Sequence, residues 1–179
     1  PEADNIGLII GGELAPRQIT SSTRFYPALA TNNLCQPPEL PLSRRSHVSF
    51  KTESGIIATC GGFNNVTKFT TCLVLASSPT TNTLGWVSDE SVPDMPDFRA
   101  SPASVVMCDG VYILGGVPST SSTSSFRLSD GVWEVGPTLP GNFRAPCSVK
   151  ISQTSFLLIG GGISSPESEQ VWEYDIRSK

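Results

Sequence analysis

A short apolar run that ends in a pair of glycines occurs four times along the 179-residue chain. The copies span residues 7–12, 55–62, 110–116 and 156–161, which gives a period near 50 residues. An internal repeat of this length that carries several short strands is typical of repeated β-sheet units. Fifteen prolines and 16 glycines interrupt the chain, and no window keeps an apolar pattern at helical spacing. The sequence therefore predicts an all-β fold without long helices.

Other landmarks keep the same register as the glycine pairs. An arginine that follows a proline stands at nearly the same distance before each of the three later pairs: these are Arg44, Arg99 and Arg144. A second apolar run follows each pair, at residues 25–26, 71–75, 125–128 and 171–174. A further run contains Trp86 in the second unit, Trp133 in the third, and Leu34 with Cys35 in the first.

These runs predict three strands in the first unit, four in each of the next two and three in the last. We expect the inner strands to be covered on both faces, because their apolar runs lack polar alternation. We expect the tryptophans to pack between neighbouring sheets rather than to stack on a ligand.

Together these landmarks resemble the kelch motif, in which an Arg-x-x-His start leads through a strand into Gly-Gly and then to a tryptophan. Residues 44–47 match that start in full, whereas the copies at Arg99 and Arg144 lack the histidine. The resemblance implies a partial kelch β-propeller over residues 1–179, with about three and a half four-stranded antiparallel blades. Its approximate units are residues 1–40 (incomplete), 41–95, 96–139 and 140–179 (incomplete). Since kelch propellers usually have about six blades, we expect the remaining blades elsewhere in a longer chain.

Composition excludes some classes of function. The chain has 12 lysines and arginines against 16 acidic residues, for a net charge of -4. Nucleic-acid binders carry clustered positive charge, so no nucleic-acid partner is predicted. The longest apolar runs reach about four residues, far short of the roughly 20 that a membrane helix needs, so no membrane span is predicted.

Catalytic and metal sites are not expected. His47 is the single histidine, and metal or acid–base sites usually combine several ligands. Galactose-oxidase-like enzymes share the kelch propeller, but their copper ligands cannot be supplied here, so a fragment of such an enzyme is the least favoured alternative. We predict no enzyme activity, no cofactor and no metal.

Five cysteines are present without any Cys-x-x-Cys pair, which argues against zinc. Cys60 ends one predicted strand, and Cys72 lies on the next. In the repeat alignment, Cys60 corresponds to Leu114 of the following unit, and Cys72 corresponds to Phe126. A hairpin about Val66 would place the two cysteines opposite each other, close enough for a disulfide. Buried free thiols are the alternative.

Asn65 begins a glycosylation sequon in the same loop. With the predicted disulfide, it favours an extracellular or secreted protein over a cytoplasmic one.

The resemblance also suggests a partner-binding face. In cytoplasmic kelch adaptors that recruit substrates for ubiquitination, arginines between blades line such a face. By resemblance, the candidates for partner contact here are Arg44, Arg45, His47, Arg99 and Arg144. A structural role, in which the arginines bind loop carbonyls, is the alternative. We therefore expect a non-catalytic scaffold that binds a protein or glycan ligand on its loop face, with a substrate-recruiting cytoplasmic adaptor as the second hypothesis.

Overall fold

The computed structural model describes residues 7–26, 37–77, 82–117, 125–141, 143–162 and 169–178. This part of the chain is entirely β-structure and loops, and it contains no helix, so none that could cross a membrane. Thirteen strands form four antiparallel sheets. The expected all-β fold is confirmed. Within the described residues the sheets do not close into a ring.

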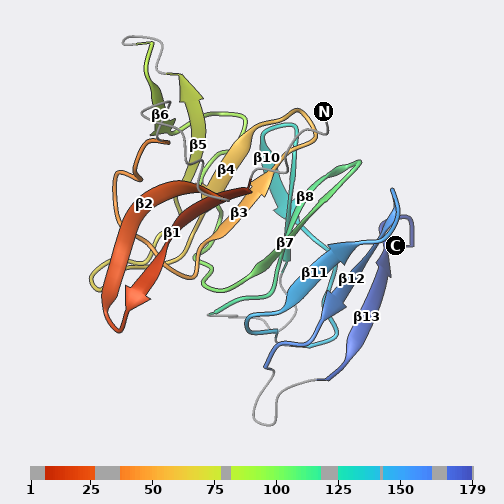
Figure 1. Ribbon diagram of the computed structural model, residues 1–179. Coiled ribbons are helices and arrows are strands. Elements are labelled where there is room, and N and C mark those ends of the chain that lie inside the picture. The colour runs from red at the N-terminus through yellow and green to blue at the C-terminus, as the bar shows by residue number, and fades with distance from the viewer. Residues whose placement is uncertain are drawn as a thin grey trace.

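Each sheet lies within one of the four units marked out by the glycine pairs (Figure 1). The first is the hairpin of β1 (Gly7–Ala15) and β2 (Gln18–Tyr26). The second contains β3 (Val48–Lys51), β4 (Ile57–Cys60), β5 (Cys72–Ser77) and β6 (Leu84–Val87). The third contains β7 (Ala103–Met107), β8 (Gly110–Leu114), β9 (Ser125–Ser129) and β10 (Val132–Val135). The fourth contains β11 (Cys147–Lys150), β12 (Ser155–Ile159) and β13 (Val171–Asp175).

Strands within each sheet follow one another in chain order. The two complete sheets and the three-stranded fourth sheet have the strand numbers expected for those units. The strand expected at Leu34 and Cys35 lies outside the described residues.

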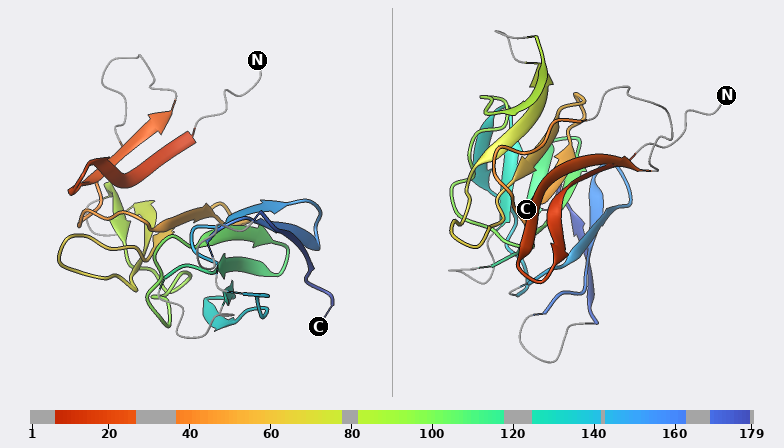
Figure 2. Two further views of the ribbon diagram at one scale, coloured as in Figure 1. Left: turned by 90° about the horizontal axis from the view of Figure 1, so that it is seen from below. Right: turned by 60° about the vertical axis from the view of Figure 1, so that its left-hand side comes forward.

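The second, third and fourth sheets pack with their first strands side by side. Strand β7 contacts both β3 and β11, and the hydroxyl of Ser148 donates to the carbonyl of Ser104 at 2.7 Å. The turns that precede these strands are linked as well: the amide of Ser101 donates to the carbonyl of Ser46, and that of Ala145 to the carbonyl of Ser101. Figure 2 shows the β1–β2 hairpin and the sheet of β13 at opposite ends of the resulting row.

The apolar core lies between sheets and consists of three clusters. One joins Leu8 and Ile10 of the hairpin to Trp86 of the second sheet. The largest joins the second and third sheets, and the last joins the third and fourth. This arrangement explains why the inner strands are apolar without alternation, since both of their faces meet a neighbouring sheet.

The glycine pairs end the second strand of a sheet where the next unit comes closest. At Gly61 the backbone has φ +71°, and a Cβ atom would lie 2.7 Å from the carbonyl oxygen of Arg99. Both features require glycine. The first copy differs, because β1 continues through Gly11 and Gly12 with a register shift. The prediction that this strand ends at its glycine pair is therefore wrong.

The second glycine of each of the first three pairs donates its amide to a carbonyl of the next unit. These bonds run from Gly12 to Arg44, from Gly62 to Arg99, and from Gly116 to Phe143. The residue equivalent to Arg44 and Arg99 is therefore Phe143, and the expected alignment of Arg144 with them is wrong by one position. The sequence contains this equivalence in the distance from the preceding proline. The prolines Pro41, Pro96 and Pro140 each stand three residues before the equivalent position.

Candidate partner-binding site

Arg44 and Arg99, two of the five residues expected to contact a partner, are buried, with exposed fractions of 2% and 1%. The guanidinium of Arg44 donates to the carbonyls of Gly61 and Thr71 at 3.3 and 3.2 Å, and it lies 4.5 Å from the ring centre of Phe69. Burial lowers its pKa. This is the structural alternative anticipated for the arginines.

Arg99 is held in the same way, between a ring and a carboxylate. Its guanidinium lies 4.7 Å from the ring centre of Phe126 and 3.2 Å from the carboxylate of Asp97. Burial is the main cause that lowers its pKa, and the charge of Asp97 opposes that shift. Because neither guanidinium reaches the surface, Arg44 and Arg99 are not retained as contact residues.

His47 is wedged between two units. A Cβ at Gly11 would lie 3.0 Å from the ring of His47, and a Cβ at Gly62 would lie 2.8 Å from its Cβ. Burial, and next the positive charge of Arg44, lower the pKa of His47 to about 4. The imidazole is therefore neutral at physiological pH and contributes no charge to a binding surface.

Arg45 and Arg144 occupy equivalent positions at the surface end of the sheets. Each pairs its backbone with the residue that follows a glycine pair, Phe63 for Arg45 and Gly162 for Arg144. The guanidinium of Arg45 lies 4.6 Å from the ring centre of Phe63 and forms an ion pair with Glu13. The side chain of Arg144 is exposed and makes no ion pair with any residue that the structure describes.

A depression of about 410 Å³ lies between the second and third sheets at this end of the molecule. We call it the loop-end depression; it is lined by Ser46, Phe63, Lys68, Phe98, Ala100, Ser101, Val117, Arg144 and Ala145. Two rings and two cations therefore share one concave surface, and no carboxylate is among these lining residues. The ammonium of Lys68 lies 5.5 Å from the ring centre of Phe98.

The loop beside the depression is tied at its base by a disulfide between Cys60 and Cys72, as predicted. The two cysteines are directly opposite each other on β4 and β5, their Cα atoms lie 4.1 Å apart, and both are buried. The equivalent of Cys72 is Ser125 rather than Phe126, because Leu114 pairs with Ser125.

Asn65 lies at the exposed tip of this loop. The side-chain oxygen of Asn64 accepts the amides of Val66 and Thr67 at 2.9 and 2.7 Å, which forms a tight turn. The side-chain nitrogen of Asn65 donates to the carbonyl of Arg17 at 3.3 Å, and the residue is otherwise open to solvent. The sequon is thus sterically accessible at the tip of this loop.

The structure brings together only part of the predicted set. Of the predicted residues, Arg144 lines the loop-end depression and Arg45 lies against the ring of Phe63, which also lines it. Asn65 is not among the lining residues, and the lining residues Lys68, Phe63 and Phe98 were missed. A usable signal existed, because Phe63 directly follows a glycine pair and Phe98 directly precedes an arginine landmark. No group of three or more histidines, cysteines or carboxylates converges within the described ranges.

Comparison with known proteins gives no further assignment. No protein-family model matches the chain. A search of curated proteins also finds no match.

Proposed function

We propose that the chain is a non-catalytic interaction module of kelch type that binds an acidic segment of a partner protein in the loop-end depression. The observation that carries this proposal is the pairing of two cations with two aromatic rings on one concave surface, without a lining carboxylate. The module has a net charge of -4, so this local excess of positive charge is not a property of the surface as a whole.

Four features support the assignment to a kelch propeller. The units repeat with glycine pairs, and the complete sheets are four-stranded meanders. The second, third and fourth sheets contact one another through their first strands, and the core lies between sheets. These features fit radially packed blades, whose loop ends commonly bind ligands.

The chemistry of the depression favours a carboxylate flanked by an apolar side chain. The guanidinium of Arg144 can donate two parallel hydrogen bonds to a carboxylate, and Lys68 adds a second positive charge. The rings of Phe63 and Phe98 offer apolar surface to the neighbouring side chain of the partner. A volume near 410 Å³ suits one or two residues of a peptide.

An extracellular or secreted location is part of this proposal. The buried disulfide and the exposed sequon at Asn65 support it. The cytoplasmic substrate-recruiting adaptor is the second candidate, and it is favoured by the exposed free thiols of Cys108 and Cys147. A mass shift on removal of N-linked glycans from the protein made in eukaryotic cells supports the first, and an unmodified Asn65 supports the second.

Peptide binding tests the function. A fluorescein-labelled peptide of alternating glutamate and leucine should bind saturably in fluorescence polarisation, and the matched glutamine–leucine peptide should bind at least about tenfold more weakly. The double substitution K68E/R144E should abolish binding of the acidic peptide, and its affinity for the wild type should fall as salt rises.

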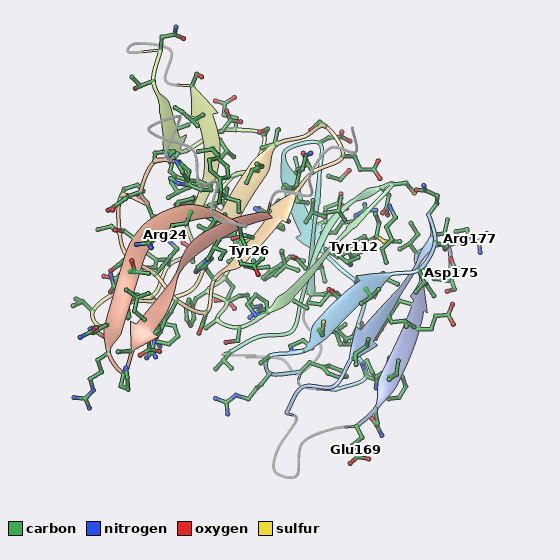
Figure 3. All side chains as sticks on the ribbon, viewed as in Figure 1. Arg24, Tyr26, Tyr112, Glu169, Asp175 and Arg177 are labelled. Carbon is green, nitrogen blue, oxygen red and sulfur yellow. A yellow bond between two sulfur atoms is a disulfide. The ribbon has the colours of Figure 1, made fainter. Side chains whose placement is uncertain are left out.

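Arg24→Glu and Arg17→Glu together form the matched control, because they make the same change of charge on the β1–β2 hairpin (Arg24 is labelled in Figure 3). This variant should keep the affinity of the wild type. Equal losses in both variants, or equal binding of the two peptides, would mean that the depression is not the acidic-peptide site.

A further inference from the structure

The backbone position that Arg144 occupies at the loop end recurs in two other units. Arg45, Ala100 and Arg144 each pair with the residue that follows a glycine pair. Ala100 and Arg144 line the loop-end depression. Arg45 does not, but Ser46, its neighbour in the chain, and Phe63, its partner on the facing strand, both do. The second unit thus places a third cation directly beside the depression.

Phe63 stands between two cations. Its backbone pairs with Arg45 on one side and with Lys68 on the other. Residues that are directly opposite on antiparallel strands have their side chains on the same face. The guanidinium of Arg45 accordingly lies 4.6 Å from the ring centre of Phe63, and the ammonium of Lys68 lies 5.5 Å from that of Phe98. The row of Arg45, Phe63 and Lys68 therefore leads into the depression.

The guanidinium of Arg45 is held by a carboxylate of the first unit. It lies 2.5 Å from one carboxylate oxygen of Glu13, and the other oxygen accepts the amide of Arg17 at 2.7 Å. The amide of Arg17 and then the guanidinium of Arg45 lower the pKa of Glu13, so this carboxylate is ionised at neutral pH. Glu13 directly follows the first glycine pair, as Phe63 follows the second. The ion pair is therefore a contact between two units of this chain, like the contacts that form the depression.

On the basis of the proposed function, we infer that Glu13 is an internal competitor of the acidic partner and determines how many cations that partner meets. Its carboxylate holds the place on Arg45 that a carboxylate of the partner would take. Because Glu13 belongs to the same chain and is fixed by the amide of Arg17, its effective concentration at Arg45 is far higher than that of a free ligand. Glu13 thus neutralises Arg45 and limits the acidic segment to Lys68 and Arg144.

Removal of the charge of Glu13 tests this role. Glu13→Gln keeps a side-chain oxygen that can accept the amide of Arg17 and a hydrogen bond from Arg45, but it leaves the guanidinium without a counter-charge. The fluorescein-labelled glutamate–leucine peptide should therefore bind this variant at least about threefold more tightly than the wild type. Its affinity should also fall more steeply as salt rises, because one more charge is engaged.

Two further variants isolate the contribution of Arg45. The double variant E13Q/R45Q has the same local net charge as the wild type and should return to the wild-type affinity. Glu39→Gln is the matched control, since Glu39 is an exposed carboxylate that accepts the hydroxyl of Ser21 of the same hairpin at 2.9 Å. It should bind the peptide as the wild type does. Glu13 and Arg45 are both partly exposed, so these variants should unfold in urea as the wild type does.

The competitor role and the proposed function fail in different ways. Equal affinities of E13Q and E39Q, weaker binding by E13Q, or a gain that persists in E13Q/R45Q would overturn the role of Glu13. Binding by the wild type that K68E/R144E abolishes would still keep the depression as the site. No binding of the peptide by either the wild type or Glu13→Gln would overturn both.

Discussion

Arg44 and Arg99 show how a surface residue type becomes part of the core. Each guanidinium lies against an aromatic ring. That of Arg44 donates to the carbonyls of Gly61 and Thr71, and that of Arg99 donates to the carboxylate of Asp97. Loss of either side chain would remove these charged hydrogen bonds and leave a cavity beside a ring. Arg144, one position out of this register, faces solvent and is free to act in binding.

This difference predicts opposite effects on stability. Arg44→Ala and Arg99→Ala should each lower the free energy of unfolding by about 3 kcal/mol, since charged hydrogen bonds and ring packing are both lost. Arg144→Ala should change it by less than about 0.5 kcal/mol, as is usual for exposed sites. Urea unfolding followed by tryptophan fluorescence measures all three. A large loss of stability in the Arg144 variant, with small losses in the other two, would contradict the assignment of Phe143 to the buried position.

His47 predicts a dependence of stability on acid. Its pKa is about 4 in the folded chain and near the ordinary 6.5 in the unfolded one, so the unfolded state takes up a proton first as the pH falls. The contribution of the neutral ring is complete above pH 6.5, is lost progressively toward pH 4, and changes no further below that. Between pH 7 and pH 5 the loss is roughly 1–2 kcal/mol.

Unfolding free energies of the wild type and of His47→Gln, measured across this interval, isolate the effect. The difference between the two proteins should change by the stated amount, because other groups titrate alike in both. A constant difference from pH 7 to pH 5 would mean that His47 titrates normally in the folded chain.

At the scale of elements, the hairpin of β4 and β5 is cross-linked by a disulfide. Its disulfide joins residues 12 apart in sequence and lies beneath the loop that carries Asn65 and Lys68. A loop of this length, closed in the unfolded chain, contributes roughly 2–4 kcal/mol to stability. The bridge therefore also holds one wall of the loop-end depression in place.

Reduction should reveal this contribution. In a C108S/C147S background, where the exposed thiols are absent, dithiothreitol should lower the free energy of unfolding by about 2–4 kcal/mol. The same substitutions without reductant should leave stability unchanged. Equal stability with and without reductant would mean that the Cys60–Cys72 bridge does not stabilise the hairpin.

Strands and the disulfide could be predicted because both depend on local patterns: apolar runs that end at glycine pairs, and two cysteines on facing strands. The contact set could not be predicted in full. Arg44 and Arg144 each follow a proline closely in the sequence, but Arg44 is buried and Arg144 is exposed. The reason is that one extra residue after Pro140 places Phe143 in the buried position. Lys68 and Phe98 belong to different units, and only the packing of one sheet on the next brings them together.

At the scale of the whole molecule, function depends on contacts between repeats. The loop-end depression takes Lys68 and Phe63 from the second unit, Phe98 from the third and Arg144 from the fourth. The turn at Ser101 links its neighbours at Ser46 and Ala145 through backbone hydrogen bonds. A single isolated unit therefore lacks the site, and the central claim concerns a surface that exists only when the sheets are packed.

Chemical-shift mapping tests that claim most directly. When the acidic glutamate–leucine peptide is titrated into the ¹⁵N-labelled chain, the largest amide shifts should come from all three units together, at Ser46, Phe63, Lys68, Ser101 and Ala145. The amides of β13 and of the β1–β2 turn should remain in place. Shifts confined to one unit, or centred on β13, would contradict a binding site built from packed repeats.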